Sequence, residues 1–148
     1  MKKRTCTFLL ALLAALTLTV PAWAETQPGD ALIYDTESLT DGERQQLESL
    51  ADQITWQYDC AVYVVTIYDY EQYADGVYEA AYTIYNDYDF GIGDGRDGVL
   101  LLLSMYDRSY SLYVRDGYAQ SMLGSYAQQQ LEDSFLDYLG DDDWYGGF

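Results

Sequence analysis

The sequence contains no histidine, and its only two lysines are Lys2 and Lys3. Without histidine the chain cannot form a Ser-His-Asp triad, a histidine phosphatase centre or a histidine-ligated zinc site. Beyond residue 24 the basic side chains are four arginines. Any chemistry must therefore use carboxylates, arginine, tyrosine hydroxyls, backbone amides or a bound metal.

Residues 1–24 have the pattern of a secretory signal peptide. A basic start precedes an apolar run over residues 8–20, and Ala22-Trp23-Ala24 then provides the small-x-small pattern that signal peptidase cleaves. The alternative is an uncleaved anchor, but the run is shorter than the roughly 20 residues that span a bilayer. We therefore predict export to an extracytoplasmic location, the cell surface or envelope, with residues 25–148 forming one domain.

Cysteine is nearly as scarce, since only Cys6 and Cys60 occur and Cys6 lies in the predicted signal peptide. The mature chain therefore has no intramolecular disulfide. Cys60 is not followed by the arginine loop of a cysteine phosphatase, and no GxxxxGK[ST] phosphate loop is present. We expect Cys60 to be a small buried hydrophobic residue.

Positive charge is also nearly absent from the predicted mature chain. All 25 acidic residues lie after residue 24, and four arginines against them leave a net charge of −21. This field repels nucleic acid and anionic lipid, so neither is an expected partner. It attracts divalent cations, and oxygen ligands favour Ca²⁺, with Mg²⁺ the less favoured ion. Alternatively, the charge only keeps an exported protein soluble.

Tyrosine, in contrast, is abundant, with 17 residues. Tyrosine offers a large contact area at low entropic cost, which suits a binding face. It also commonly lies at the boundary between core and water, which needs no partner.

The hydrophobic pattern predicts alternating strands and helices. Thr40 and Glu43 form a T-x-x-E capping box that begins a helix over about residues 40–58. The apolar stripe of this helix is Leu47, Leu50, Ala51 and Ile54. Strands are expected over residues 31–34, 60–67, 99–105 and 110–115. Further helices are expected over residues 71–88 and 125–139, the last capped by Ser125, ended by Gly140 and burying Ala127, Leu131, Phe135 and Tyr138.

This order predicts an α/β domain in which helices flank a mixed, mostly parallel sheet with right-handed crossovers. Ligands of such sheets bind beyond the carboxyl ends of the parallel strands. That edge should collect Asp35, Asp69, Asp107 and Arg108, which are the candidate catalytic residues. There a metal or a shared proton could assist hydrolysis and Arg108 could hold a phosphate. Alternatively, Asp107 and Arg108 are ordinary turn residues whose pairing contributes under about 1 kcal/mol.

The glycine-rich loop before the strand at residues 99–105 should lie at the opposite edge, with Asp94 and Asp97. It lacks the sixth-position glycine and the final glutamate of a helix–loop–helix calcium loop. It also does not join a strand to a helix, as a dinucleotide loop does. The residues favour a turn that could bind a cation. The candidate metal ligands over both edges are Asp35, Asp94, Asp97 and Asp107.

The segment GIGDGRDGVLLLLSMYDRSYSLYV, residues 91–114, resembles the signature of the TPM domain family. The family pattern is GIG after an aromatic residue, an acidic spacer, an Asn-Gly pair, an aliphatic strand and a D-R turn. Further correspondences are Tyr34-Asp35 before Leu39-Thr40, the strand of residues 61–67, Gly117-Tyr118 and residues 143–148.

The resemblance implies a Rossmann-like three-layer sandwich, and some relatives have acid phosphatase activity or bind calcium. It places Asp35, Asp97, Asp107 and Arg108 on recurring polar positions, although the family usually has asparagine where Asp97 stands. The family's last helix would begin near Trp144. We therefore expect the domain to be truncated at its C-terminus and a longer form to be membrane-anchored.

Two functions remain open. The first is a cation-binding envelope module that acts on a membrane-protein partner in assembly or maintenance. The second is a metal-assisted acid phosphatase acting on phosphomonoesters. The net charge favours the first, because it repels an anionic substrate unless a cation intervenes. A glycosidase ranks last, since it needs two carboxylates at a defined separation.

Overall fold

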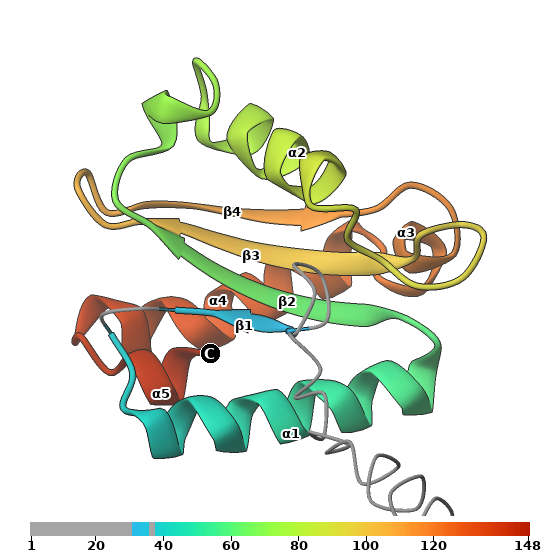
Figure 1. Cartoon of the computed structure of the whole chain (residues 1–148), viewed down its shortest axis with the longest axis horizontal. Coiled ribbons are helices and arrows are strands. Elements are labelled where there is room, and N and C mark those ends of the chain that lie inside the picture. Colours follow the sequence, from blue (N-terminus) through green and yellow to red (C-terminus); the bar gives the residue numbers. More distant parts are fainter. Residues whose placement is uncertain (1–30, 36–37) are drawn as a thin grey trace, which may run out of the picture.

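A computed structural model describes residues 31–35 and 38–148 of the chain. The predicted signal peptide, residues 1–24, lies outside the described residues. The elements follow in the order β1 (Ile33–Tyr34), α1 (Asp41–Tyr58), β2 (Ala61–Ile67), η1 (Tyr70–Gln72, a 3₁₀ turn), α2 (Val77–Asp87), β3 (Gly98–Ser104), β4 (Ser109–Val114), α3 (Tyr118–Met122), α4 (Ser125–Gly140) and α5 (Trp144–Gly147) (Figure 1).

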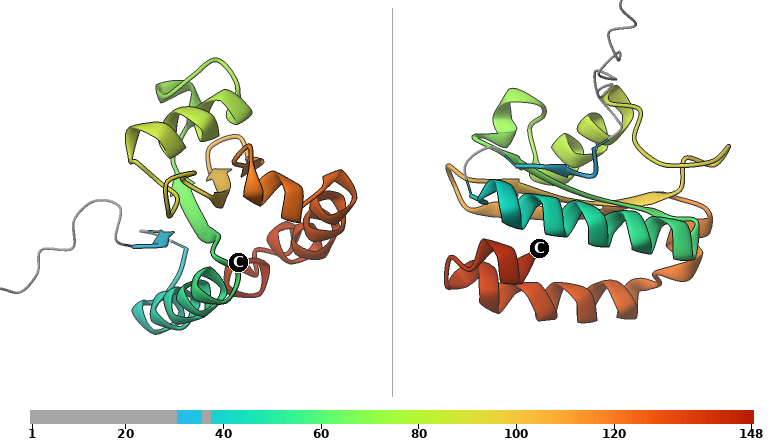
Figure 2. Two further views of the ribbon diagram at one scale, coloured as in Figure 1. Left: turned by 90° about the vertical axis from the view of Figure 1, so that its right-hand side faces the viewer. Right: turned by 60° about the horizontal axis from the view of Figure 1, so that its bottom comes forward.

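The strands form one mixed sheet in the order β1-β2-β3-β4. β1, β2 and β3 are parallel, and β4 pairs with β3 in the antiparallel direction. Helix α2 covers one face of the sheet, while α1, α4 and α5 lie on the other (Figure 2). The predicted α/β class, with a mostly parallel sheet between two helical layers, is confirmed.

The two parallel crossovers differ from the expected right-handed pair. The chain steps in one direction across the sheet, from β1 to β2 to β3. Helices α1 and α2, which make these two connections, lie on opposite faces (Figure 2). The two connections therefore have opposite hands, so one departs from the right-handed rule.

Helix α1 begins as its capping box predicts. The Thr40 side chain accepts from the backbone N–H of Glu43, and the Glu43 carboxylate accepts from the backbone N–H of Thr40. The buried stripe is Leu47, Ala51 and Thr55. Leu50 is 50% exposed, so its assignment to the core was wrong; the neighbours of Leu47 four and eight residues on lie inward instead.

The helix expected over residues 71–88 is broken into two pieces. Asp69 caps the short η1 by accepting from the backbone N–H of Glu71. Helix α2 begins only at Val77, after Gly76 takes the extended N-cap conformation. Gly76 and the preceding Asp75 favour turns and helix starts, which is why the periodic pattern is interrupted here.

Strand β3 is the centre of the core. All seven of its residues are buried, because β2 and β4 flank it and helical layers cover both faces. The strand predicted over residues 99–105 from its apolar sequence is confirmed, with bounds at Gly98 and Ser104.

Helix α4 departs from prediction at both ends. Gly124, not Ser125, is its N-cap, and no side chain caps it. Gly140 lies inside the helix, and the left-handed residue after it is Asp142. Its buried side chains are Phe135 and Leu139; of those expected inside, Ala127 is only partly buried, and Leu131 and Tyr138 are 39% and 49% exposed.

Across residues 31–35 and 38–148, none of the helices combines the length and the apolar character needed to cross a membrane.

Cys60 is expected to be chemically inert in the folded protein. Its side chain is buried, and burial together with the nearby Asp97 raises the pKa of the thiol to about 11. The reactive thiolate is therefore scarce at neutral pH. In a Cys6→Ser protein, a thiol reagent at neutral pH should label Cys60 slowly until denaturant is added. Complete labelling of the native protein within minutes would contradict the buried assignment.

Candidate functional site

The predicted catalytic residues do lie along one edge of the sheet. The register pairs Tyr34 with Val65 and Ile67 with Ser104, so β1, β2 and β3 end on the same side. This carboxyl edge holds Asp35, Asp69, Asp107 and Arg108, which follow those strands. Asp94 and Asp97 precede β3 and lie at the opposite edge.

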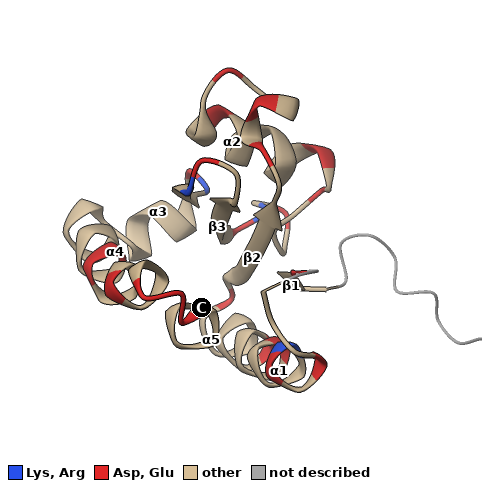
Figure 3. Cartoon of the chain, turned by 90° about the vertical axis from the view of Figure 1, so that its left-hand side faces the viewer, with Lys and Arg blue, Asp and Glu red and all other residues tan. Residues whose placement is uncertain are grey.

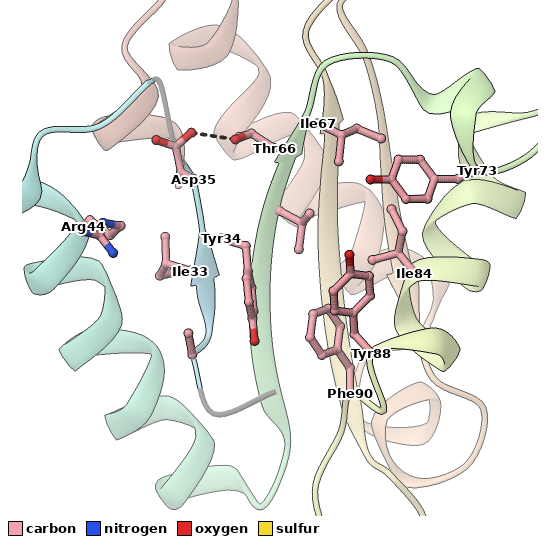
Figure 4. Close-up of a pocket in the computed structure, with 12 residues that line it drawn as sticks. Ile33, Tyr34, Asp35, Arg44, Thr66, Ile67, Tyr73, Ile84, Tyr88 and Phe90 are labelled. Atoms are coloured by element: carbon pink, nitrogen blue, oxygen red, sulfur yellow. Dashed lines mark hydrogen bonds between the residues drawn. The ribbon is translucent and has the colours of Figure 1, made fainter. Parts of the chain in front are cut away.

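Asp35 is buried, and its carboxylate serves the local fold. One oxygen accepts from the backbone N–H groups of Ser38 and Leu39, at 3.0 and 2.8 Å. The other accepts from the Thr66 hydroxyl at 2.7 Å (Figure 4). Asp35 thus closes the connection that leads into α1 and fastens it to β2.

Asp69 and Asp107 each organise a turn. Asp69 caps η1. Asp107 accepts from both the backbone N–H and the hydroxyl of Ser109, at 3.3 and 2.9 Å. Hydrogen bonds from the Ser104 hydroxyl and then from Ser109 hold the pKa of Asp107 below its usual range.

Arg108 points away from these carboxylates. Its guanidinium donates to the Asp142 carboxylate at 2.9 Å and to the carbonyl of Leu139 at 3.0 Å. It also lies over the Trp144 ring, 5.5 Å from the centroid. Arg108 therefore joins the β3–β4 turn to the end of α4 and to α5, and it would have to leave these partners to bind a phosphate.

The candidate metal ligands are divided between the two edges. Asp94 is exposed, and Asp97 accepts from the backbone N–H of Ala119 at 3.3 Å, at the start of α3. Within the described part of the chain, no three acidic or cysteine side chains gather into a group that could hold a metal ion. Calcium binding stays a prediction.

The glycine-rich loop is closed around Arg96, a residue that sequence reasoning missed. The Arg96 guanidinium donates to the carbonyls of Phe90 and Tyr85, at 3.0 and 2.9 Å. Gly91 and Gly93 adopt φ values of 98° and 67°, which only glycine tolerates readily. The only available signal was one arginine within an acidic loop that directly follows a helix.

Two buried tyrosines complete this closure. The Tyr85 hydroxyl donates to the carbonyl of Arg96 at 2.8 Å, and the Tyr63 hydroxyl accepts from the backbone N–H of Gly91 at 2.9 Å. The Phe90 ring stacks on Tyr63, with 4.1 Å between centroids. Burial is the main cause that raises the pKa of both tyrosines, so their hydroxyls stay neutral.

A hollow of about 340 Å³ lies between β1 and α2. We call it the tyrosine groove (Figure 4). Its apolar and aromatic lining consists of Ala31, Ile33, Tyr34, Val65, Ile67, Tyr73, Ile84, Tyr88 and Phe90. These residues come from separate segments of the chain, so no local sequence pattern marks them.

Among the residues that the structure describes, few in the lining of the tyrosine groove are charged. The charged residues in its lining are Asp35, which is engaged as described, and Arg44, which pairs with Asp41 at 3.1 Å. Tyr73 and Tyr88 are 39% and 42% exposed. Apolar walls with tyrosine hydroxyls at the mouth suit binding better than hydrolysis.

Comparison with known proteins identifies relatives by sequence and by fold. The sequence profile of the TPM domain matches residues 33–148. The N-terminal domain of a protein from P. gingivalis, solved by NMR, is 13% identical with a TM-score of 0.66, covering 82% of this chain and 78% of that one. The N-terminal domain of the cg2496 protein from Corynebacterium glutamicum is 11% identical with a TM-score of 0.61, covering 88% and 77%. At such identities the likeness shows the fold alone, and no curated protein matches the chain significantly.

Replacing Asp35 by asparagine should destabilise the protein. The amide keeps one acceptor oxygen and presents an NH₂ group in place of the other, so the Thr66 hydroxyl must turn from donor to acceptor. The hydrogen bonds from the N–H groups of Ser38 and Leu39 also lose their charged acceptor. The expected loss is about 1–3 kcal/mol in the free energy of unfolding, measured with urea. The control Asp94→Asn, at an exposed side chain, should stay within about 0.5 kcal/mol. Equal effects would contradict the structural role of Asp35.

Replacing Arg96 by lysine should destabilise the protein by about 2 kcal/mol, since an ammonium cannot reproduce the guanidinium fork that reaches two carbonyls. Thermal or urea unfolding measures the loss. Arg44→Lys is the matched control, because Arg44 is exposed and makes a surface ion pair. A neutral Arg96→Lys change would show that the loop does not depend on this side chain.

Proposed function

Because the chain belongs to the TPM domain family, we propose that it is an exported, noncatalytic binding module that acts on a membrane-protein partner in assembly or maintenance of the cell envelope. The observation that carries the proposal is a contrast between the carboxyl edge of the sheet and the tyrosine groove. The candidate catalytic side chains are engaged in turns and caps, whereas the tyrosine groove is open.

The carboxyl edge supports this proposal through its geometry. Asp35 is buried with three donors around its two oxygens, and Arg108 is bound to α4. A phosphatase needs groups free to contact the transferred phosphoryl group and its leaving oxygen. Each edge residue would first have to give up a contact that stabilises the fold.

The acid phosphatase is the alternative. Its strongest feature is Asp107, an exposed carboxylate whose pKa is lowered and which therefore stays ionised in acid. Such a carboxylate could hold a metal that polarises a phosphoryl oxygen. A bound cation would also offset the repulsion between an anionic substrate and a strongly acidic protein.

We expect no phosphate release from a generic phosphomonoester at mildly acidic pH, with or without Ca²⁺ or Mg²⁺. Asp35→Asn and Asp107→Asn are the informative variants, because the two side chains belong to different turns of the same edge. Turnover that disappears in both variants, while both remain folded, would place an active site at the carboxyl edge and overturn the proposal.

The acidic charge supports a second part of the proposal, namely Ca²⁺ binding. Millimolar Ca²⁺ should then raise the melting temperature more than Mg²⁺ does. At a concentration 100-fold above the dissociation constant, the bound ion would add about 2.7 kcal/mol to the free energy of unfolding. An Asp94→Asn variant, altered at an exposed carboxylate, should lose part of the shift. A melting series without any shift would remove the cation from the proposal.

A further inference from the structure

We infer that the tyrosine groove receives an amphipathic helix of the partner, with an aliphatic face and lysine or arginine along its flanks. This inference rests on the proposed function and specifies the partner's chemistry.

The two faces of the sheet are covered unequally. Four strands spaced about 4.8 Å apart are wide enough for two helices side by side, since packed helices lie about 8–10 Å apart. One face carries α1, α4 and α5, whereas α2 is the one long helix that the described residues place on the other face, against β3 and β4 (Figure 2). Within residues 31–35 and 38–148, no helix covers the part of that face over β1 and β2, where Tyr34, Val65 and Ile67 line the groove.

The edge of β1 does not favour an added strand. A partner strand would need the outward N–H groups of β1, as in strand addition. The Glu48 carboxylate accepts from the backbone N–H groups of Leu32 and Ile33, at 2.6 and 2.9 Å. Ile33 belongs to β1 and Leu32 directly precedes it, so an added strand would have to displace the Glu48 carboxylate from this edge. This favours a partner that binds through its side chains, as a helix in a groove does.

The surroundings of the groove select a basic partner. Glu71 and Asp75 are exposed before α2, and Asp87 is exposed at its last position. Asp89 is exposed after the helix and pairs with Arg96 at 3.3 Å. Figure 3 shows acidic residues in the segments on either side of α2. The aliphatic side chains of the partner would contact the apolar lining, and its flanking cations would face these carboxylates. Such charge complementarity speeds association and excludes anionic competitors.

The length of the sheet determines the length of the peptide that serves as the probe. Strand β2 has seven residues and spans about 23 Å, which a helix of about 15 residues matches. The probe is a synthetic peptide of that length with a leucine face and lysine flanks. Two comparison peptides are needed, one with glutamate in place of lysine and one with serine in place of leucine.

Binding is measured by titrating each peptide into the purified protein and following backbone amide shifts by NMR. The lysine–leucine peptide should bind and shift residues of β1, β2 and α2, with an affinity that falls as salt is raised. The glutamate and serine peptides should bind at least about tenfold more weakly. No binding of the lysine–leucine peptide at millimolar concentration overturns the inference.

Variants locate the site. Tyr88→Ala should weaken binding at least about tenfold, because Tyr88 lines the groove and is part-exposed. Tyr126→Ala is the matched control, since Tyr126 is 77% exposed on α4, on the other face. Ile67→Ser gives a second test should Tyr88→Ala not fold. Binding that survives both groove variants, or weakens equally in Tyr126→Ala, overturns the inference.

The remaining outcomes separate this inference from the proposed function. Self-association that Tyr88→Ala abolishes would identify a second copy of the chain as the occupant of the groove. It would overturn the inference that a helix of another protein binds there. Phosphate release by the same samples would test the proposed function independently. A protein that neither turns over substrate nor binds the peptide keeps the noncatalytic proposal and loses the groove as its binding site.

Discussion

The structure depends on the guanidinium of Arg96. By donating to the carbonyls of Tyr85 and Phe90 it ends α2, where unpaired carbonyls favour a cation, and turns the chain back toward β3. The Tyr85 hydroxyl returns a hydrogen bond to the carbonyl of Arg96, so helix and loop hold each other. This closure also fixes Phe90 against Tyr63 and thereby forms one wall of the tyrosine groove. A loop that resembles a ligand cradle by composition is thus a structural clamp.

Hydrogen bonds within the fold account for part of the acidity of the chain. Several carboxylates accept hydrogen bonds from backbone N–H groups at helix starts and turns, a role that lysine and arginine cannot take because they have no acceptor atom. Asp35, Asp69 and Asp107 do so at the carboxyl edge, and Asp143 does so for α5. Carboxylates are strong acceptors for backbone N–H groups, so the fold explains these acidic residues without any ligand. Of the exposed acidic residues around α2, Asp89 pairs with Arg96 at 3.3 Å, whereas Glu71, Asp75 and Asp87 are the carboxylates that we propose face a partner.

Local chemistry made much of the fold predictable. The Thr40–Glu43 capping box and the apolar run of β3 each carry their own physical reason, and both were confirmed. The opposite hands of the crossovers, the exposure of Leu50 and the end of α4 depend on which face each helix covers, which periodicity does not encode. The carboxyl edge followed from strand order, but the partners of its side chains did not. Arg108 could have faced either the carboxylates or α4, and only packing decides.

The unequal faces explain why a binding role fits this version of the α/β sheet. An enzyme of this class needs polar groups beyond the strand ends that are held in place yet free to react. Here those groups are held in place by hydrogen bonds within the fold, as the three donors around Asp35 illustrate. Within the described residues, apolar surface over β1 and β2 has no covering helix, and tyrosines and carboxylates border it. Covering this apolar surface would stabilise a complex by about 25 cal/mol for each Å² that is removed from water. The burial of this apolar surface is the driving force that we propose for association with a partner.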